Sequence, residues 1–279
     1  MDLLNRRSDQ IIMKDLKELR TEIDIVDKEL IEILKKRYDI TEQIGEYKAQ
    51  TGAALFCPER EEEKIKALSE KLGDYKNSEY IENTFRAVMD YAKYQQSNNT
   101  YGRKDICLIG MPGCGKTTVG KILASKIQRE LIDMDKLFTY VYQVTPAACI
   151  EKSGEEEFRR LETLLLNNIK ARRDLYKTQD YNPMKNSTCS RIISCGGGIV
   201  VKDENKEILK KDSIVFYIKR DTGLLAKNGR PLSLKNGVEA LYAERAEKYE
   251  SWSDYTIVND KDLEKCVAEI IEILKSNKN

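Results

Sequence analysis

The sequence predicts two domains, an all-α domain over residues 1–96 and an α/β domain over 104–279, joined by a linker at 97–103. Apolar residues recur every three or four positions between residues 16 and 47, which is typical of a long helix. The apolar run 106–109 enters the glycine-rich segment GMPGCGKT, and further short apolar runs then alternate with helical stretches. A chain of 279 residues is long enough for two domains that each bury a core.

Composition and charge exclude several classes of protein. Lysine and arginine number 48 against 47 aspartate and glutamate residues, so no net positive field favours nucleic acid or an anionic membrane. No apolar stretch approaches the roughly 18–20 residues that cross a bilayer, and residues 1–7 lack a signal peptide's apolar core. The seven scattered cysteines, without C-x-x-C spacing, fit reduced thiols. We therefore expect a cytoplasmic protein. The absence of histidine leaves acid–base chemistry to Asp, Glu and Lys.

Three helices are expected in the first hundred residues. The first runs from about residue 12 to 49, with apolar steps alternating between three and four, and would be about 55 Å long. The others cover 59–72 and 78–96, with Pro58 opening the second and Gly73 separating the two. A helix as long as the first needs partners along its whole length, so the pattern favours an intertwined homodimer.

Arg37 stands on the first helix where an apolar residue is due, between Ile33 and Ile40. Lys48 lies eleven residues further on, about three turns, and projects from the same face. Arg20 points elsewhere and would serve another face or another subunit. A buried guanidinium requires an anion, although one such arginine taken alone is more simply explained by a side chain that reaches solvent at a bundle edge.

The segment GMPGCGKT matches the phosphate-binding loop G-x-x-x-x-G-K-[ST] in its strand–loop–helix setting. Its glycines let backbone N–H groups converge on phosphate oxygens, and the positive end of the following helix faces the same anion. Lys116 would reach the β- and γ-phosphates, and the Thr117 hydroxyl would bind Mg²⁺. The predicted contacts with a nucleoside triphosphate are Gly113, Cys114, Gly115, Lys116, Thr117 and Thr118.

Strands are expected at 106–109, 130–133, 191–194, 213–218 and 254–258, and their alternation with helices predicts a doubly wound parallel sheet. Ligands should then lie at the carboxyl ends of the strands. Asp133 and Asp135 close the second strand. In an extended segment their side chains point the same way, one toward Mg²⁺ through water and one toward a substrate hydroxyl. A solvated acidic turn is an equal alternative.

Further candidates are weak signals when taken singly. Arg159 and Glu162 lie three residues apart on a helix, by default an ordinary surface ion pair. The glycines at 196–198 follow the third strand and either present N–H groups to a ligand or form a turn. Arg230 lies in a segment with the composition of a mobile lid, where an arginine could meet the transferring phosphoryl group. Arg245 lies one helical turn from Tyr249.

Together, in this order after the loop, these motifs resemble shikimate kinase of the nucleoside-monophosphate-kinase fold over about 104–275. The resemblance implies ATP and Mg²⁺, with Asp133 contacting the metal and Arg230 closing over the phosphates. It implies that Asp135 binds the ring hydroxyls and takes the proton of the attacking one. The implied contacts with shikimate are Asp135, Phe158, Arg159, Glu162, Gly196, Gly197, Gly198 and Arg245. The polar segment 174–190 departs from the family and is expected to be a surface insertion.

The first domain resembles the all-α chorismate mutase family through LR at 19–20, KKR at 35–37, GEYK at 45–48, PERE at 58–61 and the closing Gln96. The resemblance implies an entwined homodimer that rearranges chorismate to prephenate without a cofactor. It places Arg37 and the partner subunit's Arg20 on the two carboxylates, Lys48 and Gln96 on the ether oxygen, and Arg60 and Glu61 on the remaining polar groups. Cys57 and Ala92 replace an Asp and a Ser that are usual in the family.

The leading hypothesis is therefore a bifunctional enzyme of aromatic amino-acid biosynthesis. In the alternative, the helical domain is a dimerisation module that binds chorismate or prephenate and regulates the kinase. In a third hypothesis, the kinase transfers the phosphoryl group to a small metabolite other than shikimate. The combination of Asp135, Arg159 and Arg245 argues against it.

Overall fold

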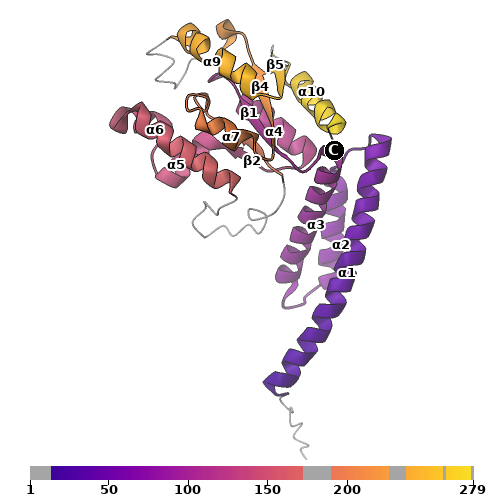
Figure 1. Cartoon of the computed structure of the whole chain (residues 1–279). Helices are drawn as coiled ribbons and strands as arrows, with labels where there is room; N and C mark the ends of the chain where they lie inside the picture. Colours follow the sequence, from indigo (N-terminus) through magenta and orange to yellow (C-terminus); the bar gives the residue numbers. More distant parts are fainter. Residues whose placement is uncertain (1–13, 172–189, 226–236, 260–261, 278–279) are drawn as a thin grey trace, which may run out of the picture. The chain divides into compact units, whose positions relative to one another are not determined.

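The computed structural model describes residues 14–171, 190–225, 237–259 and 262–277 (Figure 1). The chain divides into two compact units, Met1–Ile44 and Gly45–Asn279. Among the described residues, none of the helices combines the length and the apolar character needed to cross a membrane.

Three helices occupy the first hundred residues, as the sequence predicts. They are α1 (Leu16–Thr51), α2 (Pro58–Leu72) and α3 (Ser78–Tyr101). Pro58 lies in the first turn of α2, where its missing N–H is not needed, and the Gly73 N–H closes the helix on the carbonyl of Ser69. An ion pair of 2.8 Å between Lys93 of α3 and Glu61 of α2 ties these two helices together.

The expected linker at 97–103 is helical for most of its length. α3 continues to Tyr101, and Ser97 and Tyr101 are buried. The cause is a contact that is distant in sequence: the buried Arg129 guanidinium donates to the Ser97 hydroxyl at 3.1 Å and to the Gly102 carbonyl. The polar residues at the end of α3 therefore pack against the α/β domain instead of forming a flexible joint. The domain limits themselves stay a prediction.

Five strands in the described part of the chain form one sheet, and all neighbouring pairs are parallel. The strands are β1 (Asp105–Ile109), β2 (Leu131–Asp133), β3 (Ile192–Ser194), β4 (Ser213–Lys219) and β5 (Tyr255–Val258), in the order β2-β3-β1-β4-β5. The predicted five-stranded parallel sheet is thus confirmed. Ser194 lies opposite Leu108 on one side and Asp133 on the other, so three strands end at one edge.

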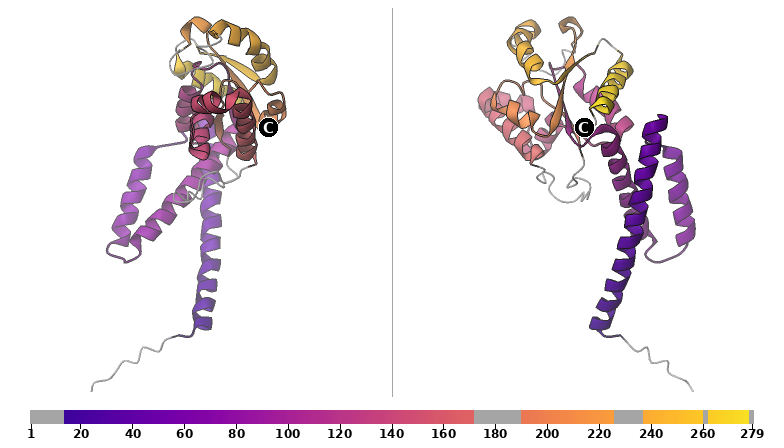
Figure 2. Two further views of the ribbon diagram at one scale, coloured as in Figure 1. Left: turned by 90° about the vertical axis from the view of Figure 1, so that its left-hand side faces the viewer. Right: turned by 45° about the vertical axis from the view of Figure 1, so that its right-hand side comes forward.

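Helices cover both faces of the sheet (Figure 2). On one face α4 (Lys116–Ile127) contacts β1, β2 and β3, and α10 (Leu263–Ser276) packs against α4 and β5. The other helices are α5 (Met134–Tyr142), α6 (Pro146–Lys170), α7 (Glu204–Lys210) and α9 (Val238–Trp252), of which α7 and α9 contact β4. The core lies between these layers, and every residue of β1 is buried.

One charged residue belongs to this core. Asp105 opens β1 with 3% of its surface exposed, and its carboxylate lies 3.2 Å from Lys170 Nζ and 3.3 Å from Arg191 Nη2. It also accepts the backbone N–H of Arg191 at 2.9 Å. Because all three charges are buried, removal of one leaves the others without compensation.

We expect Asp105→Asn to lower the free energy of unfolding by about 3–5 kcal/mol, because Lys170 and Arg191 then lose the buried charge that faces them. Glu250→Gln is the matched control, since it removes the partner of Lys219 in an exposed pair and should cost less than about 1 kcal/mol. Urea unfolding midpoints measure both. Equal shifts in the two variants would contradict this account of the buried cluster.

Candidate active site

The phosphate loop joins the end of β1 to the start of α4. Gly115 has φ +102°, in the left-handed region that favours glycine, and a Cβ at this position would collide with the side-chain amide of Asn259. Lys116 is buried, and its ammonium donates to the carbonyls of Gly110 at 2.8 Å and Met111 at 2.9 Å. The lysine therefore lies against its own loop, at the N-terminal end of α4, where backbone N–H groups favour an anion.

Asn259 holds this loop from outside and was not predicted from the sequence. It follows β5, is 1% exposed, and its Nδ2 donates to the carbonyl of Cys114 at 2.6 Å. The C=O and N–H of a trans peptide point in opposite directions, so this bond turns the Gly115 N–H away from Asn259. An asparagine after an apolar strand is too common a signal to have identified this role.

Three oxygen-bearing side chains meet where β2, β3 and α4 come together. The Thr117 hydroxyl donates to Asp133 Oδ2 at 2.8 Å and lies 3.3 Å from the Ser194 hydroxyl. Oxygen ligands of this kind suit Mg²⁺, which is usually held by one or two carboxylates together with phosphate and water. Among the described residues there is no group of three or more acidic, Cys or His side chains that could hold a metal ion. Ser194 was not predicted from the sequence.

The prediction that Asp133 and Asp135 share an extended segment is wrong. Met134 already begins α5, and Asp133 is its N-cap, with Oδ1 accepting the backbone N–H groups of Asp135 at 3.1 Å and Lys136 at 3.2 Å. These bonds satisfy amides that a helix start leaves free, so capping overrides extension. Asp133 is consequently fixed beside Thr117, while Asp135 lies in the first helical turn.

Arg159 and Glu162 form a buried ion pair rather than the surface pair that their spacing suggests. Each is 3% exposed, and Arg159 Nη1 lies 2.7 Å from Glu162 Oε2. Glu155 adds a second contact to the guanidinium at 3.0 Å. Burial raises the pKa of the Glu162 carboxyl, and the charge of Arg159 opposes part of that rise.

The glycines after β3 allow this ion pair to approach the backbone. A Cβ on Gly198 would overlap the Arg159 guanidinium, so only glycine fits there. A Cβ on Gly196 would meet Glu162 Oε1 at 2.5 Å and Asp135 Oδ1 at 3.2 Å, which shows that both carboxylates flank this glycine.

Two more predicted residues lie close to this group. Arg245 of α9 is 4% exposed, its Nε has no hydrogen-bond partner among the described residues, and the Glu244 carboxylate lies 3.6 Å away. Phe158 is buried, with its ring centroid 4.9 Å from the Arg159 guanidinium carbon. Tyr249, one turn from Arg245, donates its hydroxyl to the Gly197 carbonyl and thereby anchors the glycine segment. Arg230 lies outside the described residues, and so do residues 174–189 of the expected insertion.

The predicted chorismate contacts fall in both units. Arg20 and Arg37 lie on α1 in the first unit, and Lys48, Arg60, Glu61 and Gln96 lie in the second. Their assembly into one site stays a prediction.

Within the second unit these side chains have local partners. Lys48 donates to the Leu55 carbonyl at 2.8 Å, and Arg60 forms an exposed pair with Glu63 at 3.0 Å. Gln96 is buried beside Gly45, where an added Cβ would lie 3.1 Å from the Gln96 Cγ.

Family models match both halves of the chain. The shikimate kinase model matches residues 112–275, which is more than half of the chain. The chain belongs to the shikimate kinase family. The chorismate mutase type II model matches residues 19–97, so the family's kinase domain is here fused to a chorismate mutase domain. This is the composition of a bifunctional enzyme of aromatic amino-acid biosynthesis.

Individual relatives agree with the first match. A shikimate kinase of Clostridium beijerinckii is 35% identical over 184 residues, 63% of this chain and 97% of that protein. One of Enterococcus faecalis is 31% identical over 183 residues, 62% of this chain and 99% of that protein. The solved shikimate kinase of Acinetobacter baumannii in complex with shikimate superposes with a TM-score of 0.56 and 28% identity, and the match covers 65% of this chain and 98% of that one.

We expect Asn259→Ala to raise the KM for ATP about five- to tenfold, the value of one buried hydrogen bond, with little change in the KM for shikimate. Asn205→Ala is the matched control, because it removes a similar buried bond to the Ile199 carbonyl away from the loop. Steady-state kinetics with each substrate varied in turn measures the effect. If both variants changed the KM for ATP equally, Asn259 would have no particular role in the loop.

Proposed function

We propose that the kinase domain transfers the γ-phosphoryl group of ATP to a ring hydroxyl of shikimate. The observation that supports it is the convergence of Asp135, Arg159, Glu162 and Arg245 around the glycines after β3, at the sheet edge that carries the phosphate loop. Two buried guanidiniums are suited to a substrate carboxylate, and a carboxylate beside them is suited to hydroxyl groups. Phosphoryl transfer needs mainly positioning and charge neutralisation, which this edge supplies.

Each side chain then has one task. Lys116 and the N-terminus of α4 bind the phosphates, and Arg159 and Arg245 bracket the shikimate carboxylate. Asp135 orients the attacking hydroxyl and accepts its proton. Thr117 and Asp133 would hold Mg²⁺, which when bound neutralises charge on the phosphates. We assign Arg230 to the phosphates on the strength of the family resemblance.

We further propose that the helical domain converts chorismate to prephenate as a homodimer. Apolar side chains along α1 support the dimer, because they are 49–64% exposed in the single chain: Ile23, Val26, Leu30 and Ile33. In the dimer, Arg37 of one subunit and Arg20 of the partner subunit would bind the two carboxylates, and Lys48 and Gln96 would stabilise the ether oxygen as its bond breaks. No general base is required.

A regulatory module is the second candidate for this domain. One observation favours it: the ammonium of Lys48, which the mutase reaction needs at the ether oxygen, is bound to the Leu55 carbonyl. In this case, chorismate or prephenate would bind without reacting.

We place the enzyme in the cytoplasm. Six cysteines are described, all of them free thiols and five of them buried, which suits a reducing compartment.

Asp135→Asn should reduce shikimate phosphorylation by about 10²–10⁴-fold, because the amide cannot accept the hydroxyl proton. The rearrangement of chorismate by the same variant should be unchanged. A coupled assay for ADP and the loss of chorismate absorbance measure the two activities on one preparation. Loss of both activities would contradict two separate sites.

Chorismate alone, without ATP, should disappear in the presence of the protein, and Arg37→Ala should remove this activity, because one substrate carboxylate then has no counter-charge. Absorbance follows the reaction, and calorimetry measures binding. If wild type bound chorismate without turning it over, the regulatory function would replace the mutase function.

A further inference from the structure

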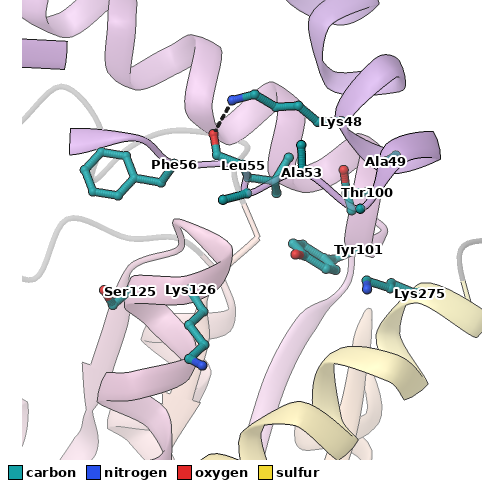
Figure 3. Close-up of a pocket in the computed structure, with 12 residues that line it drawn as sticks. Lys48, Ala49, Ala53, Leu55, Phe56, Thr100, Tyr101, Ser125, Lys126 and Lys275 are labelled. Carbon is teal, nitrogen blue, oxygen red and sulfur yellow. Dashed lines mark hydrogen bonds between the residues drawn. The ribbon is translucent and has the colours of Figure 1, made fainter. Parts of the chain in front are cut away.

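A cavity of about 560 Å³ lies apart from the residues of the kinase site. The last turn of α1, the segment 52–56 and the ends of α3, α4 and α10 surround it (Figure 3). None of the phosphate-loop residues, Asp135, Arg159 or Arg245 is among its lining residues. Its volume falls within the range of pockets that take small molecules.

Lysines are the charged residues among the described ones that line the cavity. Lys48, Lys126 and Lys275 come from the last turns of α1, α4 and α10. A lysine in a last turn offsets the negative end of its own helix, which explains each one singly. It does not explain why three of them line one cavity that has no carboxylate among its described lining residues.

Lys48 donates to the Leu55 carbonyl, whereas the present partners of the other two lysines are exchangeable. Lys126 lies 2.6 Å from Glu264 and Lys275 lies 3.0 Å from Glu272, and both glutamates are mostly exposed. Exposed ion pairs contribute little to stability, so a ligand carboxylate can compete for the ammonium groups.

The rest of the lining is mainly apolar, with two aromatic rings and the hydroxyl groups of Thr100, Tyr101 and Ser125. Figure 3 shows the ring of Tyr101 beside Lys275, with Phe56 on the opposite side of the view. The Tyr101 hydroxyl is protonated at neutral pH and can donate a hydrogen bond, and burial raises its pKa further. Thr100, which also lines the cavity and is 6% exposed, has a buried Oγ1 without a hydrogen-bond partner among the described residues.

We propose that this cavity binds a small ring compound that carries carboxylate groups. Lys126 and Lys275 bind the carboxylates, and the rings of Phe56 and Tyr101 and the neighbouring alanines pack against its ring. Inorganic phosphate shares the charge but not the ring, so it binds more weakly. The lining residues come both from the predicted helical domain and its linker (residues 48–101) and from the kinase domain (residues 125, 126 and 275). Lys126 lies on α4, the helix that begins at Lys116 of the phosphate loop.

The test is calorimetry of the full chain with 5-hydroxyisophthalate, its uncharged diamide and inorganic phosphate. We expect the dicarboxylate to bind, and Lys126→Gln and Lys275→Gln each to weaken binding about tenfold, the value of one charge-assisted hydrogen bond. Lys265→Gln, an exposed lysine of α10 outside the cavity, should bind as wild type does. Tyr101→Phe keeps the ring and serves as a second variant, with a few-fold loss expected.

Three outcomes would overturn the proposal. They are no binding of the dicarboxylate, equal binding of the diamide or of phosphate, and unchanged binding in both lysine variants. Arg37→Ala must leave the affinity unchanged, because loss of binding in that variant alone would place the compound in the predicted chorismate site instead.

Discussion

The parallel register of β1, β3 and β2 is the constraint on which the kinase site depends. Because Ser194 is paired with Leu108 and with Asp133, the ends of three strands lie at one level, and the loop after β1 brings Thr117 to the same place. A shift of one residue would turn each side chain to the opposite face of the sheet. The buried apolar side chains of β1 resist such a shift, so the core fixes the geometry of the site.

Two buried arginines, Arg159 and Arg245, lie near the same edge of the sheet, and they differ in how well the protein satisfies their guanidinium groups. Arg159 is matched by Glu162 and Glu155, and Gly198 gives it room. Arg245 is equally buried, yet its Nε has no hydrogen bond among the described residues. A buried polar group without a partner is unfavourable, and an anionic substrate removes that cost on binding. In the proposed site both arginines face the substrate carboxylate: Arg159 is held in place by Glu162 and Glu155, and Arg245 has the hydrogen-bonding capacity that the carboxylate would use.

Local patterns were sufficient for most of the fold. The five strands, the helices and the phosphate loop follow from apolar periodicity, glycine spacing and Pro58, all of which act within a few residues. The set of Asp135, Arg159, Glu162, Arg245 and the three glycines could be named because a family resemblance supplied the grouping, and the structure brings its described members together.

The failures share a different cause, which is contact between segments far apart in sequence. The end of α3 is helical because Arg129, which follows α4, donates a hydrogen bond to it. Asn259 follows the edge strand β5 and donates a hydrogen bond to the phosphate loop after β1. Ser194 gained its role only through strand pairing. Asp133 is an exception, since its capping of α5 was local, but it competed with a strand pattern that ended at the same residue.

The central claim is that the two buried arginines recognise the carboxylate of the acceptor. The most direct measurement is a double-mutant cycle on kcat/KM that combines Arg245→Met with replacement of the shikimate carboxylate by an uncharged carboxamide. The account predicts that each change alone lowers kcat/KM strongly, and that the second change adds little once the first is made. Fully additive losses would contradict it, because they would mean that Arg245 and the carboxylate do not interact.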